Sequence, residues 1–414
     1  MATVDPEVRT SELGRRFGEV REHTEKLAAP LSPEDQMVQS MPDVSPTKWH
    51  RGHTTWFFET FILPLQHDEY SVFHPAFGYI FNSYYEAVGS RQPRDQRGVI
   101  SRPSVGEVAD YRGHVDKMMG ELLFASRPPS NVLDLVELGL NHEQQHQELL
   151  LMDIKHVLWC NPLMPAYCAD ERLATAVSNR LGWVEHDGGT VELGHRGEGF
   201  GFDNEFPLHQ ALLTPFAVAD RLVTCGEWLE FMADGGYRRP ELWLSDGWAT
   251  VNQQDWEAPL YWSKDGEAWQ VFSLCGPREV NPSEPVCHVS YYEADAYAHW
   301  TGLRLPTEPE WEAIAAEHRC ETATHLHPFG NDTSMGDLFG EVWQWTASAY
   351  CPYPGFRAAP GAVGEYNGKF MVNQHVLRGG ACVTPDGHTR ATYRNFFHPA
   401  SRWAFSGLRL ARDL

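Results

Sequence analysis

The sequence of 414 residues contains no apolar run near the about 18 residues that a membrane-spanning helix needs, so we expect no membrane association. Its start carries charges where a secretion signal would need an apolar core, which favours a cytoplasmic location. Basic residues are scarce, because 33 Lys and Arg stand against 56 Asp and Glu and give a formal net charge of -23. Such an acidic surface repels phosphate backbones and argues against nucleic-acid binding.

Cysteine is present but without a recognisable spacing. The eight cysteines include no CxxC pair, so neither a disulfide framework nor a zinc ribbon is indicated. Internal repeats and low-complexity tracts are absent as well. Histidine and tryptophan are instead abundant, with 20 His and 15 Trp. The histidine excess favours a metal site or an acid–base site, since imidazole is the commonest protein metal ligand.

Helical periodicity dominates the first 160 residues. Apolar residues recur at steps of three and four in four segments, residues 13–31, 47–66, 105–124 and 132–158. Four such segments in one stretch predict a helical bundle over residues 1–160.

The pattern changes near residue 160. The segment WCNPLMPAYCADERL, residues 159–173, loses the helical period and carries two prolines, so we place a linker at 161–180. Residues 181–414 then mix short strand-like runs with Gly and Pro turns and only two or three helices. The expected fold class is a multidomain α and α+β protein, with a four-helix bundle first and an α+β domain second.

A histidine pair lies in the last of the predicted helices. In LNHEQQHQELL, His142 and His146 are four residues apart, which places both imidazoles on one face of a helix. Two nitrogens placed in this way can share one metal ion, and a third ligand can come from His50 or His53 in WHRGHTTWFFETF. The core of a bundle is where ligands from facing helices meet. The same spacing also suits a solvated polar face, so the pair alone does not establish a metal site.

The ligand type narrows the choice of metal. Three neutral imidazoles without a carboxylate suit zinc with one open position, or ferrous iron with up to three. The spacing does not decide between them.

At these residues the chain resembles a known family. The motifs HTTWFFE and NHEQQHQE, followed by LRLPTEPEWEAIA, GEVWQWTASAY and LRGGACVTPDGHTRATYRNFFHP, look like those of the ergothioneine-biosynthesis sulfoxide synthases (EgtB-type). The resemblance covers nearly the whole chain, from about residue 10 to the end. It implies a DinB-like four-helix bundle over 1–160 and a formylglycine-generating-enzyme-like domain of the C-type-lectin kind over 181–414.

The resemblance implies roles for particular residues. His53, His142 and His146 look like the three ligands of a non-haem Fe(II) that uses O2 as co-substrate, and His50 then becomes an imidazole that packs behind them. Gln145 looks like a group that holds hercynine, the trimethylated histidine substrate. Asn395 would share that role, and Phe396 and Phe397 would line the pocket, since aromatic faces attract a trimethylammonium cation. From residues alone, RNFF suits the buried core of the second domain better than a binding pocket.

The segment FNSYYEAVGSRQPRDQRGV carries further candidates. Tyr84 and Tyr85 match a tyrosine pair of the subgroup that accepts cysteine, and we expect them on a helix with Tyr85 as the catalytic acid and Tyr84 in support. Arg91, Arg94 and Arg97 are candidates for the carboxylate of the thiol substrate, because a guanidinium grips that group in two places. They also suit a charged surface.

Two departures from the family pattern bear on the chemistry. The region around RGGACVTPDG has only Cys382 where formylglycine-generating enzymes need a cysteine pair, which argues against formylglycine formation. Another subgroup of the synthases takes its acid from the C-terminal domain, where Tyr393 is the nearest tyrosine by sequence but is assigned a packing role. The choice between cysteine and γ-glutamylcysteine as sulfur donor therefore stays open.

The resemblance implies an enzyme that joins a thiol to the imidazole of hercynine and gives a sulfoxide. Three rival functions remain open: a selenoneine synthase using a seleno-sugar, a zinc-dependent thiol transferase, and a non-enzymatic sensor or binding module. The oligomeric state is not indicated by the sequence.

Overall fold

The computed structural model describes residues 6–65, 70–125, 128–168, 180–320, 322, 324–331, 333–359 and 362–414. Its backbone contacts divide into two compact units, one of residues Met1–Leu163 with Pro360–Tyr366 and one of Met164–Ala359 with Asn367–Leu414. The expected order of a helical bundle before an α+β domain is confirmed. Residues 169–179 of the expected linker lie outside the described residues.

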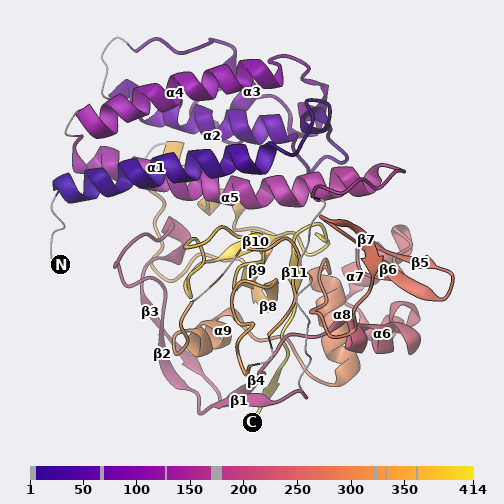
Figure 1. The fold of residues 1–414 in the computed structure, drawn as a ribbon. Coiled ribbons are helices and arrows are strands. Elements are labelled where there is room, and N and C mark those ends of the chain that lie inside the picture. Colours follow the sequence, from indigo (N-terminus) through magenta and orange to yellow (C-terminus); the bar gives the residue numbers. More distant parts are fainter. Residues whose placement is uncertain are drawn as a thin grey trace. The chain divides into compact units, whose positions relative to one another are not determined.

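Among its described residues, the first unit is a bundle of four long α-helices and one short α-helix. Figure 1 shows the long helices running side by side, and each packs against at least two of the others. Their bounds are α1 Pro6–Ala28, α2 Thr47–Phe61, α3 Phe77–Phe81, α4 Val105–Ala125 and α5 Ser130–Cys160. Across the described residues, no helix combines the length and apolar character that crossing a membrane requires.

Helix α2 is the centre of the bundle, because 13 of its 15 residues are buried. A helix buried on every side must satisfy its polar side chains internally. The buried ion cluster of the bundle shows how this is done. The carboxylate of Glu143 on α5 accepts from the guanidiniums of Arg21 and Arg112 at 2.9 Å each and from Thr24 Oγ1 at 2.6 Å. Burial raises its pKa, but the two guanidiniums outweigh burial and lower the pKa to about 2.

A glycine of α2 allows the close approach of α3. A Cβ at Gly52 would lie 2.2 Å from the ring of Phe81, whose backbone carbonyl accepts a hydrogen bond from His53 Nδ1 at 2.6 Å. We expect Gly52→Ala to lower the free energy of unfolding by about 1–3 kcal/mol, because the ring and its backbone must shift. Gly113→Ala in α4 is the matched control, since nothing lies within 4 Å of its added Cβ.

The control variant should gain up to about 1 kcal/mol through helix propensity alone. Urea unfolding of both variants measures the difference. Equal stability of Gly52→Ala and the parent protein would show that the bundle accommodates the methyl group without movement.

The second unit contains four small sheets and four helices among its described residues. The largest sheet has the order β10-β9-β8-β11, and the others are β1-β4-β12, β5-β6-β7 and β2-β3. The strands are β1 Trp183–His186, β2 Gly189–Leu193, β3 His209–Leu213, β4 Phe216–Ala219, β5 Trp262–Asp265, β6 Ala268–Ser273, β7 Gly276–Glu279, β8 Trp343–Ala349, β9 His375–Arg378, β10 Asn395–Phe397, β11 Ser406–Gly407 and β12 Ala411–Asp413. The helices are α6 Cys225–Ala233, α7 Ser245–Gln253, α8 Tyr291–Thr301 and α9 Glu308–Ala315.

Helix α9 anchors the strand that carries the RNFF motif. The helix starts with a capping box in which Thr307 accepts from the backbone N–H of Glu310, a pattern that satisfies otherwise unpaired amides. The first residue of α9, Glu308, then accepts from Arg378 on β9 at 2.9 Å and from Arg394 at 2.7 Å. Arg394 immediately precedes β10, so this buried ion network holds the start of β10 in place.

Candidate metal centre

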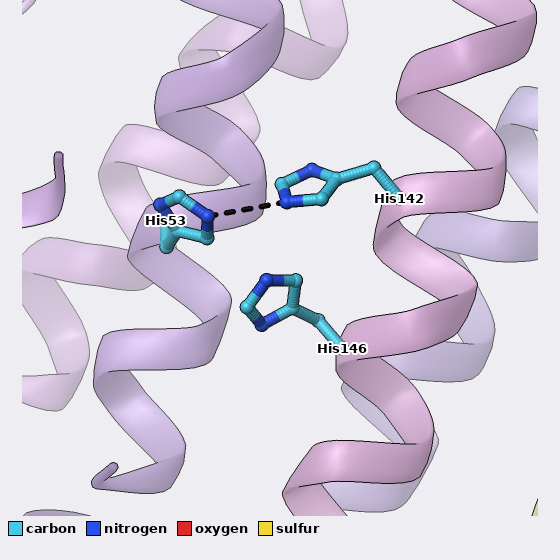
Figure 2. A group of neighbouring side chains, drawn as sticks. All are labelled: His53, His142 and His146. Atoms are coloured by element: carbon cyan, nitrogen blue, oxygen red, sulfur yellow. Dashed lines mark hydrogen bonds between the residues drawn. The ribbon is translucent and has the colours of Figure 1, made fainter. Parts of the chain in front are cut away.

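Three histidines from two helices meet inside the bundle. His53 lies on α2, while His142 and His146 lie one turn apart on α5, and Figure 2 shows the three rings facing one another. Each offers one ligand nitrogen, and these nitrogens all lie within 4.8 Å of one another. Within the described part of the chain this is the only group of three or more potential metal-binding side chains so arranged.

The surroundings keep these imidazoles neutral. Burial lowers the pKa of His142 to about 3. Burial also holds the pKa values of His53 and His146 well below the usual range, and the neighbouring histidines add to the shift. A neutral imidazole has a free lone pair on one nitrogen, which is the form that binds a metal.

The spacing of the rings fits a metal ion. The Nε2 atoms of His53 and His142 are 3.2 Å apart. Two nitrogens each about 2.1 Å from a shared ion are about 3.0 Å apart at an octahedral right angle and about 3.4 Å apart at a tetrahedral angle. The observed separation lies between these values, so the residues fit ferrous iron and zinc alike.

A tryptophan forms one wall of the centre. The indole of Trp49 stacks on His53 with ring centroids 4.6 Å apart, and the guanidinium of Arg97 lies 3.4 Å from the Trp49 ring centroid. The indole N–H donates to the backbone carbonyl of Ile80 at 2.9 Å, which fixes its orientation. His53 is therefore held both by ring stacking and by its hydrogen bond to the Phe81 carbonyl.

The tyrosine pair does not lie on a helix, which corrects that expectation. Helix α3 ends at Phe81, and the buried side chain of Asn82 donates to the carbonyls of Tyr85 and Gly89 and accepts from the Tyr85 amide. These side-chain bonds replace helical ones and make a loop. The rings of Tyr84 and Tyr85 stack with centroids 4.7 Å apart, and Tyr85 is fully buried against Trp56.

A third tyrosine, which sequence reasoning missed, lies at the centre. Tyr366 belongs to the short segment that packs with the first unit, and its ring centroid is 5.6 Å from that of His142 and 6.0 Å from that of Tyr84. The side chain of Glu365 accepts from the backbone amides of Glu86 and Ala87, which fastens this segment beside the tyrosine loop. No local pattern in the sequence signals this contact, since the segment is more than 200 residues from His142 in the chain.

The three arginines differ in their environments. Arg91 is half-buried and pairs with Glu86, and Arg94 is exposed and donates to the carbonyl of Asp43 at 2.5 Å. Arg97 is buried at 3 % exposure and donates to Ser45 Oγ at 2.9 Å and Ser83 Oγ at 3.2 Å. Among the described residues it forms no salt bridge, and its Nε has no hydrogen-bond partner. Burial lowers the pKa of Arg97 well below its usual value.

The residues expected to hold hercynine fall in both units. Gln145 is half-buried on α5, between His142 and His146 in the sequence of that helix. Asn395, Phe396 and Phe397 form β10 of the second unit and are each half-buried. The ring of Phe396 stacks on Tyr350 with centroids 4.0 Å apart, whereas the Phe397 ring contacts Trp403 edge-on. Tyr393 is buried and packs against Trp343 and His388.

Comparison with family models matches both parts of the chain. The sulfatase-modifying factor enzyme 1-like domain matches residues 175–324 and 316–414, and the DinB superfamily matches residues 16–150. The chain is therefore a two-domain protein. Its helical bundle carries the histidine cluster, which is a candidate metal centre, and the sulfatase-modifying factor enzyme 1-like domain follows the bundle. The chain belongs to the sulfatase-modifying-factor-like family, in the group whose members are named hercynine oxygenase.

The curated relatives show how far this similarity extends. The hercynine oxygenase of Mycobacterium tuberculosis is 31% identical over 304 residues, which cover 66% of this chain and 70% of that protein. That of Mycolicibacterium smegmatis is 35% identical over 51% of this chain, but the match spans only 56% of that protein. A formylglycine-generating enzyme of Streptomyces coelicolor is 27% identical over 60% of this chain and 95% of its own length.

Proposed function

We propose that this protein is an iron(II)- and O2-dependent sulfoxide synthase that joins the thiol of cysteine to the imidazole of hercynine. One hercynine, one cysteine and one O2 give the sulfoxide and one water, because O2 accepts the four electrons released in forming the C–S and S=O bonds. The observation that carries the proposal is the cluster of three neutral imidazoles, two buried and one half-buried, in a chain whose relatives are named hercynine oxygenase.

The candidate site residues have separate roles in this proposed reaction. Ferrous iron bound by His53, His142 and His146 would supply the redox chemistry and stabilise the thiolate form of the sulfur donor. Holding both substrates turns a multi-body encounter into an intramolecular one, which is the main contribution of the protein. Gln145 and Asn395 are the proposed hydrogen-bonding partners of hercynine, and Phe396 and Phe397 the proposed contacts of its cation.

Arg97 is the best placed of the three arginines to bind the carboxylate of the sulfur donor. The buried guanidinium of Arg97 has lost its water of hydration and has no ion-pair partner among the described residues. A bound carboxylate would therefore stabilise its charge more than it would stabilise an exposed guanidinium, because the cost of desolvation has already been met in the fold. Arg94 is exposed, so screening weakens any contribution it makes, and Arg91 is half-buried and already paired with Glu86.

The proposal is tested by product analysis. The protein is purified without oxygen, its metal content is measured, and ferrous iron, hercynine and O2 are supplied with cysteine, γ-glutamylcysteine or a seleno-sugar. We expect O2-dependent formation of hercynylcysteine sulfoxide, identified by mass, with cysteine as the preferred donor.

The other outcomes separate the rival functions. Product with γ-glutamylcysteine alone would reassign the donor, and selenoneine formation would reassign the element that is transferred. Absence of O2 consumption with every donor would end the oxygenase proposal. Thiol transfer supported by zinc under those conditions would favour a zinc-dependent transferase.

A further inference from the structure

A fourth histidine and an aspartate lie directly behind the centre. His50 Nδ1 is 2.8 Å from His146 Nδ1, and His50 Nε2 is 3.0 Å from Asp153 Oδ2. The same oxygen of Asp153 accepts from the backbone N–H of Ser45 at 2.8 Å. His50 and Asp153 are buried, with 2% and 3% of their surfaces exposed. Hydrogen bonds therefore run without a break from the backbone of Ser45, two residues before α2, through Asp153 and His50 to a candidate metal ligand.

This series of hydrogen bonds determines which nitrogen of each imidazole carries the hydrogen. Asp153 Oδ2 is an acceptor, so His50 Nε2 must carry the hydrogen that faces it. A neutral imidazole has one N–H, which leaves His50 Nδ1 as an acceptor. His146 Nδ1 must then carry the hydrogen between the two rings, and the lone pair of His146 lies on Nε2. The opposite assignment would place the lone pair of His50 Nε2 against a carboxylate oxygen.

We propose that His50 and Asp153 are positioning residues that preset His146 in its Nδ1–H tautomer and leave its Nε2 lone pair available to the metal. This inference rests on the metal centre of the proposed function and adds to it the groups that prepare one ligand. Hydrogen bonds of this kind behind a ligating histidine fix its tautomer and its ring orientation.

The three ligands are prepared to different degrees. His53 is set in the same tautomer by the Phe81 carbonyl, which accepts from its Nδ1. His142 differs, because its Nδ1 has no hydrogen-bond partner among the described residues and its Nε2 lies 3.2 Å from His53 Nε2. In the metal-free protein His142 must supply the hydrogen between those two nitrogens, since His53 Nε2 holds a lone pair. His142 is therefore the ligand that must change tautomer when a metal binds. His53 and His146 are already in the Nδ1–H tautomer, which leaves the Nε2 lone pair free for the metal.

The tautomer can be read directly in the metal-free protein. We expect long-range 1H–15N correlation spectra of [15N]histidine-labelled protein to show His146 with a protonated Nδ1 and an unprotonated Nε2, its signals being assigned through His146→Gln. In His50→Phe the acceptor is lost, and the spectra should show the Nε2–H tautomer of His146 gaining population. His50→Gln should restore the parent pattern, because its amide oxygen can accept from His146 and its amide N–H can donate to Asp153.

Metal affinity supplies the second readout. Titration with Co2+ followed by its visible absorbance should show binding weakened roughly 10- to 100-fold in His50→Phe and in Asp153→Ala, the range typical when a partner of a ligating histidine is removed. His50→Gln should lose much less. His114→Phe on α4 is the matched control, because His114 lies in the same bundle but contacts Phe73. It should leave both the tautomer and the Co2+ affinity unchanged.

The result that overturns the proposal is a parent-like His146 tautomer in both His50→Phe and Asp153→Ala. A His146 of the parent protein already in the Nε2–H form overturns it too. Failure of the proposed reaction is distinguishable, because the tautomer is measured without metal or substrate. A parent protein that shows the expected tautomer but makes no sulfoxide would contradict the proposed function and leave this inference standing.

Discussion

Replacing His142 by alanine is expected to abolish iron binding and, with it, sulfoxide formation. The remaining pair of imidazoles must share the ion with water, and ferrous iron is held weakly by so few nitrogen ligands. The loss should exceed the roughly 10- to 100-fold expected when a group behind a ligand is removed. His53→Ala and His146→Ala should behave in the same way, because all three ligand nitrogens lie within 4.8 Å of one another.

Iron content after anaerobic reconstitution and desalting measures this effect without any assay of activity. His156→Ala is the control on the same helix, since His156 bonds to Ser40 Oγ at 2.6 Å instead of facing the other three histidines. The control should retain the iron content of the parent protein. Equal iron content in His142→Ala and the parent would remove His142 from the centre.

The histidine centre could be predicted from the sequence to the extent that helical periodicity determines it. The four-residue spacing of His142 and His146 places both on one face of α5, and α5 packs against α2, where His53 lies. Spacing alone left His50 and His53 as equal candidates for the third ligand. The structure separates them by their partners: His53 Nε2 faces His142, whereas both ring nitrogens of His50 are engaged, by His146 and by Asp153.

The tyrosine loop could not be predicted in the same way. The segment after Phe81 has tyrosines and apolar residues that suit a helix, but the side chain of Asn82 bonds to the backbone three and seven residues ahead and stops it. Competition between side-chain and helical backbone hydrogen bonds depends here on the single buried side-chain amide of Asn82. It leaves no periodic pattern in the sequence. The contact of Tyr366 with His142 depends on a segment near residue 360 packing with the first unit, which only tertiary structure can reveal.

The change from helices to strands along the chain is the part of the fold that composition predicts best. Helix formers at a regular period give way to glycine, proline and short strand-like runs, and the described strands all lie after residue 180. The pairing of those strands has no such signal. Strand β4 pairs with β1 and with β12, which is almost 200 residues later in the chain, because side chains far apart in sequence share one core.

Tyr366→Phe is expected to change the product of the reaction rather than the binding of its components. The proposed synthase needs a proton donor for the reacting oxygen before the carbon–sulfur bond closes, and the ring of Tyr366 contacts the candidate ligand His142. A phenol with an ordinary pKa near 10 can donate that proton from Oη without first being charged. Loss of a general acid typically costs roughly 100- to 10,000-fold in rate.

Without the donor, oxygen would be consumed mainly by the sulfur of the thiol, so cysteine sulfinic acid should replace the sulfoxide as the main product. Tyr84→Phe should have a smaller effect, because the ring of Tyr84 contacts that of Tyr366 and helps to orient it. The prediction from the sequence placed the acid at Tyr85, whose ring is fully buried against Trp56 and Phe61. Tyr85→Phe therefore serves as the comparison.

The ratio of sulfoxide to sulfinic acid, measured by mass in all three variants at equal iron content, decides between these tyrosines. A switched ratio in Tyr85→Phe with a parent-like ratio in Tyr366→Phe would return the role to Tyr85. A parent-like rate and ratio in every variant would mean that no tyrosine of this cluster donates the proton. If Tyr366 is the donor, its separation from His142 in sequence explains why the tyrosine pair alone points to the wrong phenol.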